Sequence, residues 1–137
     1  MTDNNDNLGK ILEDIGLQPE PIEYGSFHID FGPPYLPIST GFAAITETKQ
    51  FIFYLNFGFH VSPERRIDVL RCVSRANWGL IIGNFEFDMD DGHLRFKSSV
   101  DLDGVDLIDS LIRNAILGAM KAVETHSESL IKTAIPR

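Results

Sequence analysis

The most regular pattern along the chain is an alternation of apolar and other side chains over residues 50–61. Every odd position in this segment is apolar, and a period of two is the pattern of a β-strand with one buried face. The other face is mixed, so we predict a central strand whose second face is at most half exposed. The apolar positions are Phe51, Phe53, Leu55, Phe57, Phe59 and Val61, and the opposite positions include Ile52, Tyr54, Asn56, Gly58 and His60.

Two segments nearer the N-terminus are predicted to join this strand in a sheet. Residues 23–31 alternate apolar and polar side chains, and the motif GPPYLP that follows them ends the strand. Residues 41–46 are expected to form a hairpin with residues 50–61 through a turn at TETK. The apolar positions of the first segment are Phe27, Ile29 and Phe31.

Residues 85–90 and 93–102 are predicted to form a second hairpin around Asp91-Gly92. Asp-Gly suits the positive φ angles of a two-residue type I′ turn, and such a turn sets the register of the two strands. Each acidic residue of the first strand then faces a basic or titratable residue, and each such pair contributes roughly 0.2–1 kcal/mol. The expected pairs are Asp90 with His93, Asp88 with Arg95, Glu86 with Lys97, Met89 with Leu94, and Phe87 with Phe96.

The acidic residues of this hairpin, in the stretch FEFDMDDGHLRF, also raise the possibility of a calcium loop. The spacing argues against one. When Asp88 is taken as the first ligand, Gly92 falls at the fifth position of the loop instead of the sixth, and Ser99 stands where a bidentate Glu is needed. The charged ladder therefore explains the acidic residues better than a metal site does.

A helix is predicted from Pro63 to Asn77, because Ser62 can cap it and proline suits the first helical position. Its apolar residues gather on one side of the helical wheel. Ile67 is the exception, since it lies among the polar side chains. The residues on the apolar side are Val69, Leu70, Cys72, Val73 and Ala76.

Two further helices are predicted, over residues 8–17 and 105–131, and residues 1–7 are expected to be disordered. The last helix has a broad apolar stripe that includes several alanines, which allow close packing. The acidic residues at its start suit the positive end of the helix dipole. The stripe comprises Ile108, Leu111, Ile112, Ala115, Ile116, Ala119, Ala122 and Val123.

Length and charge narrow the possible functions. The chain has 137 residues, and residues 8–137 are predicted to form a single domain. Its net charge of −8 opposes binding to nucleic acid or to an anionic membrane. The N-terminus does not resemble a signal peptide, and the apolar runs are much shorter than a membrane-spanning helix needs. We therefore expect a cytoplasmic protein.

The order helix, three strands, helix, two strands, helix resembles that of the YbjN-like family of bacterial proteins, described as candidate sensory transduction regulators. The residues that carry the resemblance are FIFYLNFGF, the Arg-Ala-Asn at 75–77, GNFEFDMDDGHLRF and VDLDGVDLI. The resemblance implies an α+β fold with an antiparallel five-stranded sheet, like that of the type III secretion chaperones. It also implies a small acidic homodimer that binds another protein, with the second helix near the dimer axis.

No pattern in the chain predicts an active site. The histidines at 28, 60, 93 and 126 lack the spacing of metal ligands, so no metal or cofactor is expected. Neither a nucleophile motif of the form G-x-S-x-G nor a glycine-rich phosphate loop is present. The single cysteine, Cys72, is expected to be an unreactive side chain packed on the buried side of the helix. A chain with one cysteine cannot form an internal disulfide. We predict that the protein is not an enzyme.

Four arginines in and near the second helix leave two interpretations open. Arg65, Arg66, Arg71 and Arg75 are either solvated and paired with nearby carboxylates, or a docking site for an acidic partner. Ile67 is likewise either a single exposed side chain or part of a dimer interface. Leu117, on the polar side of the last helix, is a weaker interface candidate.

We therefore predict a non-enzymatic protein-binding module, chaperone-like or regulatory, that forms a homodimer and binds a protein or peptide. The alternative is a small-molecule sensor or enzyme with a pocket lined by phenylalanines. The partner is expected to bind the second face of the central strand or an exposed strand edge. The candidate interface residues are Ile67, Arg71 and Trp78, and the candidate partner-binding residues are Ile52, Tyr54 and Asn56.

Overall fold

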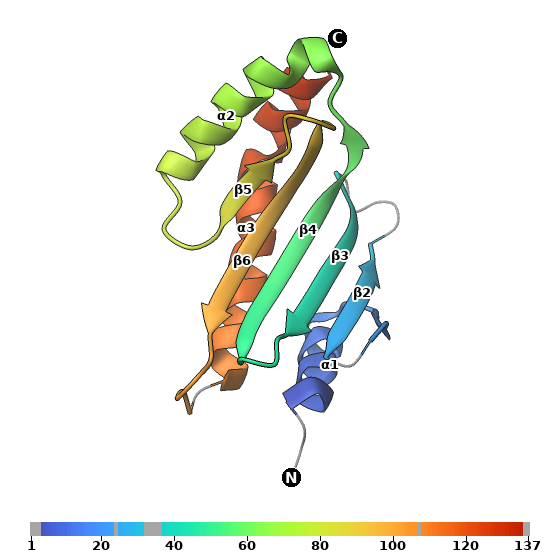
Figure 1. The fold of residues 1–137 in the computed structure, drawn as a ribbon, viewed down its shortest axis with the longest axis vertical. Coiled ribbons are helices and arrows are strands. Elements are labelled where there is room, and N and C mark those ends of the chain that lie inside the picture. The colour runs from blue at the N-terminus through green and yellow to red at the C-terminus, as the bar shows by residue number, and fades with distance from the viewer. Residues whose placement is uncertain (1–3, 24, 32–36, 107, 136–137) are drawn as a thin grey trace.

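The computed structural model describes residues 4–23, 25–31, 37–106 and 108–135. It contains one six-stranded antiparallel sheet in the order β1-β2-β3-β4-β6-β5, together with three α-helices (Figure 1). The strands are β1 (Pro19–Pro21), β2 (Ser26–Asp30), β3 (Ile38–Ile45), β4 (Gln50–His60), β5 (Asn84–Phe87) and β6 (His93–Asp101). The helices are α1 (Asn4–Ile15), α2 (Arg66–Trp78), which follows the 3₁₀ turn η1 (Pro63–Arg65), and α3 (Ile108–Ala134).

The predicted α+β fold is confirmed, but the sheet has six strands instead of five. The additional strand is β1, whose three residues Pro-Glu-Pro are too short and too rich in proline to show a strand pattern. Other boundaries also differ. Helix α1 begins at Asn4, inside the segment that was expected to be disordered, β2 begins at Ser26, and α3 begins at Ile108. The GPPYLP interruption lies outside the described residues, except for Pro37.

The helices leave one face of the sheet uncovered (Figure 1). Helices α1 and α3 cover one face of the sheet, and α2 packs against α3 and β5. No described helix crosses the other face, which is turned toward the viewer in Figure 1. We call this surface the open sheet face.

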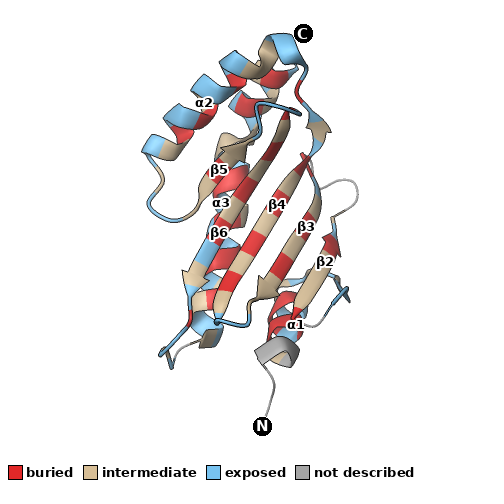
Figure 2. Cartoon of the chain, in the orientation of Figure 1, coloured by how far each residue is buried: buried red, intermediate tan, exposed pale blue. Residues whose placement is uncertain are grey.

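Strand β4 has the two faces that its alternation predicts. Phe51, Phe53, Leu55 and Phe57 are almost completely buried against the helices, and Figure 2 shows the resulting alternation of buried and half-buried positions. Burying each of these side chains contributes roughly 1.5–3 kcal/mol. The apolar stripe of α3 packs against β4 and β6. Its central residues from Ile112 to Val123 are buried in the same core.

The predicted register of the second hairpin is wrong by two residues. Glu86 pairs with Arg95, and Phe85 pairs with Phe96. The turn is therefore longer than the two-residue type I′ turn expected, and it closes with a hydrogen bond from the Gly92 amide to the Asp88 carbonyl at 2.8 Å. Because the shift is an even number of residues, each side chain remains on its predicted face.

Contacts from distant residues explain the longer turn. The Val61 amide donates to the Gly92 carbonyl at 2.9 Å, so the tip of the hairpin is fixed to the end of β4. The Arg66 guanidinium donates to the carbonyls of Val61, Met89 and Asp90 at 3.0–3.2 Å. The local preference of Asp-Gly for a two-residue turn is overridden by these tertiary hydrogen bonds.

Two expectations for the second helix also need correction. The Ser62 side chain makes no capping hydrogen bond, and the helix starts instead through the 3₁₀ turn at Pro63. Leu70, predicted on the buried side, is 40% exposed because the core contacts of α2 centre on Val69, Val73 and Ala76. Cys72 is half-buried.

Candidate functional site

Large apolar side chains are exposed along α2 and the loop that follows it. Trp78 is 93% exposed and Ile81 is 98% exposed. We call this surface the α2 ridge; its members are Ile67, Leu70, Trp78, Ile81 and Ile82. Gathered apolar groups of this size are uncommon on the surface of a monomer and typically mark an interaction site.

The ridge borders a shallow apolar cleft of about 480 Å³ between α2 and β5. Leu70 and Trp78 line it from the helix, and Phe85 and Phe87 line it from the strand. Its polar lining consists of Ser74 and Asn77, and the Asn77 amide is already used to hydrogen-bond the backbone of Phe85. The cleft therefore lacks the convergent free polar groups that the alternative of a small-molecule pocket requires.

Tyr54 is the centre of the open sheet face. Its ring lies between Phe42, with ring centroids 6.0 Å apart, and Arg95, whose guanidinium carbon is 4.0 Å from the ring centroid. Asn56 lies beside it and donates to the Thr40 hydroxyl at 3.2 Å. The predicted residues Tyr54 and Asn56 are thus brought together, with an aromatic and a cationic neighbour that the sequence did not reveal.

Glu86 organises the charges on this face. It accepts a hydrogen bond from Arg95 at 2.7 Å and from Lys97 at 3.1 Å, so one carboxylate holds both cations. Partial burial raises the pKa of Glu86, but the hydrogen bonds from Arg95 and Lys97 outweigh it and hold this pKa below its usual value. The face is therefore pre-arranged, with Arg95 stacked on Tyr54 in a fixed position.

The two edge strands, β1 and β5, each carry a feature that disfavours pairing with another strand. The Ile22 amide donates to the Ser26 carbonyl, and this ladder turns Pro19 and Pro21 outward, where proline has no N–H to offer. At the other edge, Asn77 occupies the outward N–H and C=O of Phe85. Natural sheets use both devices to prevent pairing between edges.

The predicted interface residues lie on the exposed side of α2. Ile67 and Trp78 belong to the ridge, and Arg71 is exposed beside them, with its guanidinium 3.8 Å from Asp68. Ile81 and Ile82 were missed, because they lie in a loop that has no periodicity against which an exposed position can be recognised. The apolar run Leu-Ile-Ile between Gly79 and Gly83, outside any predicted strand, is the signal that could have identified them.

The histidines do not form a metal site within the described part of the chain, which contains no group of three suitable ligands. His60 and His93 stack with ring centroids 5.7 Å apart. Burial and the charge of Arg95 lower the pKa of His93. His126 is half-buried and packs edge-on against Phe85, with ring centroids 5.7 Å apart. No helix among the described residues is long and apolar enough to span a membrane.

Comparison with known proteins relates most of the chain to one family. Residues 4–130 match the YbjN family model, described as "Putative bacterial sensory transduction regulator". The structure of YbjN from E. coli matches with a TM-score of 0.64 at 12% identity, over 90% of this chain and 92% of that one. A comparison with curated proteins finds no match.

Two structures of protein complexes are also similar in fold. The ExsC–ExsE complex contains a chain with a TM-score of 0.56 and 13% identity, matched over 93% of this chain and 92% of that one. The heterodimeric ExoU–SpcU complex from the type III secretion system of Pseudomonas aeruginosa contains another, with a TM-score of 0.58 and 18% identity over 93% and 98%. The fold is therefore that of the type III secretion chaperones, as the sequence resemblance implied.

Proposed function

The chain belongs to the YbjN family, and we propose that it is a non-enzymatic homodimer that binds another polypeptide in a chaperone-like or regulatory role. Two proteins with a similar fold come from complexes with protein partners, ExsC–ExsE and ExoU–SpcU. The observation that carries the proposal is the α2 ridge.

A second copy of the chain is the occupant that best suits the ridge. A two-fold axis beside α2 would bring Ile67 and Trp78 of each copy against the ridge of the other, because a symmetric dimer uses one self-complementary surface twice. Arg71 lies beside these residues and has donors for polar groups at the rim of such an interface. Burial of five large apolar side chains per copy supplies the driving force.

The open sheet face is the surface that we assign to the partner polypeptide. Protection of the edge strands β1 and β5 disfavours addition of a strand to either of them and supports recognition through side chains on the face. Tyr54 and Arg95 offer a rigid aromatic and cationic platform, and Asn56 and Ile52 extend it. Tyrosine and arginine are also among the residues most enriched at the centres of protein interfaces.

The test is capture of a partner by the tagged protein from its native lysate, quantified by mass spectrometry. Wild type is compared with Tyr54→Ala and with Leu117→Ala, which removes an exposed apolar side chain from α3. We expect a stoichiometric partner that is lost with Tyr54→Ala and retained with Leu117→Ala. Equal capture by both variants would contradict the assignment to the open sheet face, and a retained small molecule in place of a protein would favour the sensor alternative.

A further inference from the structure

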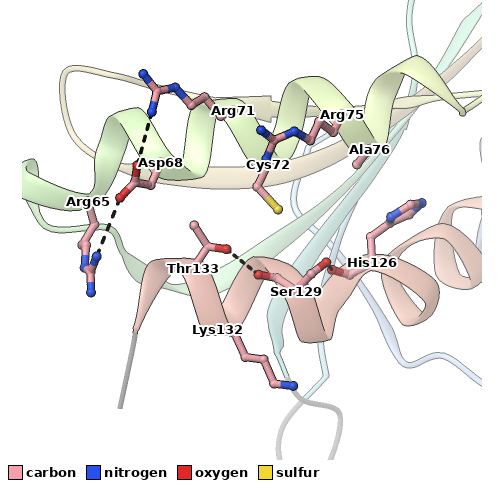
Figure 3. Close-up of a pocket in the computed structure, with 10 residues that line it drawn as sticks. All are labelled: Arg65, Asp68, Arg71, Cys72, Arg75, Ala76, His126, Ser129, Lys132 and Thr133. Carbon is pink, nitrogen blue, oxygen red and sulfur yellow. Dashed lines mark hydrogen bonds and ion pairs between the residues drawn. The ribbon is translucent and has the colours of Figure 1, made fainter.

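A second surface of α2 has a different character from the ridge. A groove of about 720 Å³ lies between α2 and the last turns of α3, and its lining includes Arg65, Arg71, Arg75 and Lys132 (Figure 3). The Cys72 sulfur points between the two helices, toward the side of α3 that carries Thr133. Ala76, Ser129 and Thr133 complete this uncharged part of the lining.

The groove concentrates positive charge on an acidic protein. Four of the twelve Lys and Arg residues line it, Asp68 is the one carboxylate in the lining, and Glu128 pairs with Lys132 beside it, so two positive charges remain in excess. The whole chain has a net charge of −8. Since salt screens charges over about 8 Å at physiological ionic strength, a ligand within the groove responds to the local excess more than to the distant carboxylates.

Several of these cations have hydrogen-bond donors to spare. Asp68 is shared between Arg65 at 3.7 Å and Arg71 at 3.8 Å, so one loosely placed carboxylate serves two guanidiniums. Arg75 forms no ion pair with any residue that the structure describes. Lys132 is already paired with Glu128 at 2.9 Å, so the free donors belong mainly to α2. Each guanidinium presents five N–H groups.

We propose that this groove binds an acidic segment of a polypeptide. The segment from Arg65 to Arg75 extends about 15 Å along the helix, at about 1.5 Å per residue. Such a span matches several carboxylates distributed along a chain, whereas a single phosphate or carboxylate would occupy only one part of it. That the ligand is a polypeptide rests on the proposed protein-binding function, but the groove lies apart from the open sheet face.

The experiment is a fluorescence anisotropy titration with a fluorescein-labelled peptide of repeated Glu-Glu-Ala units. The groove variant is Arg65→Gln with Arg75→Gln, which leaves the ridge and Arg71 intact. The matched control, Arg113→Gln with Lys121→Gln, removes the same charge from parts of α3 outside the groove lining. We expect the groove variant to weaken binding about fivefold or more and the control to weaken it less than about twofold.

Three results would overturn the proposal. They are equal loss of affinity in both double variants, equal binding of a Gln-Gln-Ala peptide, and complete displacement of the Glu peptide by about 10 mM inorganic phosphate, which would indicate a site for a small anion. The Tyr54→Ala variant is expected to bind the Glu peptide as wild type does. Failure of the open sheet face as a partner site would therefore be distinguishable from failure of the groove.

Discussion

The side chain of Asn77 hydrogen-bonds both backbone groups of Phe85: its amide nitrogen donates to the carbonyl at 3.0 Å, and its amide oxygen accepts from the N–H at 2.7 Å. A helix side chain thus completes the outer edge of β5 as a neighbouring strand would. Phe85 itself is buried and packs edge-on against Phe96, with ring centroids 4.9 Å apart.

The first prediction concerns this pair. Asn77→Ala leaves the partly buried N–H of Phe85 without a partner, while the Phe85 carbonyl keeps only the Asn84 side-chain amide at 3.2 Å, and this costs roughly 1–3 kcal/mol of unfolding free energy. Asn114→Ala makes the same chemical change at an exposed position of α3 and is expected to have little effect. Urea denaturation of the two variants measures the difference. Similar stabilities would show that the Asn77 hydrogen bonds contribute little.

The second prediction concerns Gly92. A Cβ at this position would lie 2.2 Å from the Val61 carbonyl oxygen, whereas a Cβ at Gly104, which has a similar positive φ of 74°, meets nothing within 4 Å. Gly104→Ala therefore measures the backbone strain alone, about 1–2 kcal/mol. Gly92→Ala is expected to lose at least about 1 kcal/mol more in urea denaturation, because the clash is with backbone. Equal losses of unfolding free energy in the two variants would mean that the turn around residue 92 shifts to accommodate the Cβ without further destabilisation.

The third prediction tests the dimer. Ile67→Asp places a charge in the centre of the α2 ridge, and burial of an unpaired charge strongly opposes association. Light scattering is expected to report a dimer for wild type and a monomer for the variant. Leu117→Asp introduces the same charge at another exposed apolar position, on α3, and should remain dimeric. A dimeric mass for Ile67→Asp would exclude the ridge as the interface.

The fourth prediction concerns pH. The pKa of Glu86 is lower in the folded protein than its usual value of 4.5, so its contribution to stability is present above that value and is lost as the pH falls through the folded pKa. Glu86→Gln should remove this contribution, at most about 1 kcal/mol for a partly exposed pair, and flatten the fall in stability between about pH 6 and pH 3. The surface variant Glu124→Gln is the control. An unchanged pH profile for Glu86→Gln would contradict the prediction.

Strand β4 could be predicted from the sequence because one buried face is sufficient to impose a period of two. The turn between β5 and β6 could not, since its length depends on the hydrogen bonds of Val61 and Arg66, which are distant in the sequence. The alternation of apolar and charged side chains did predict correctly which residues of β5 and β6 share each face of the sheet. Glu86 was expected opposite Lys97, and it bonds that residue diagonally while lying directly opposite Arg95.

The surfaces were predictable to different degrees. Ile67 could be recognised because it breaks the helical pattern, and Tyr54 because it shares the second face of a strand. The stacking of Arg95 on Tyr54 depends on the pairing of β4 with β6, which joins segments about forty residues apart and leaves no trace in the local sequence. Asn77 was noticed only as part of a family motif, and its contact with Phe85 gives that motif a physical reason.

Helix α2 is tied to the β5–β6 hairpin at both ends, by Arg66 near its start and by Asn77 near its finish. A helix held in this way has little freedom left to lose when a ligand arrives, so association on either flank avoids most of the entropic cost of ordering a binding surface. Contacts at the ridge or in the groove should therefore form without a preceding folding step, at rates limited by encounter and orientation.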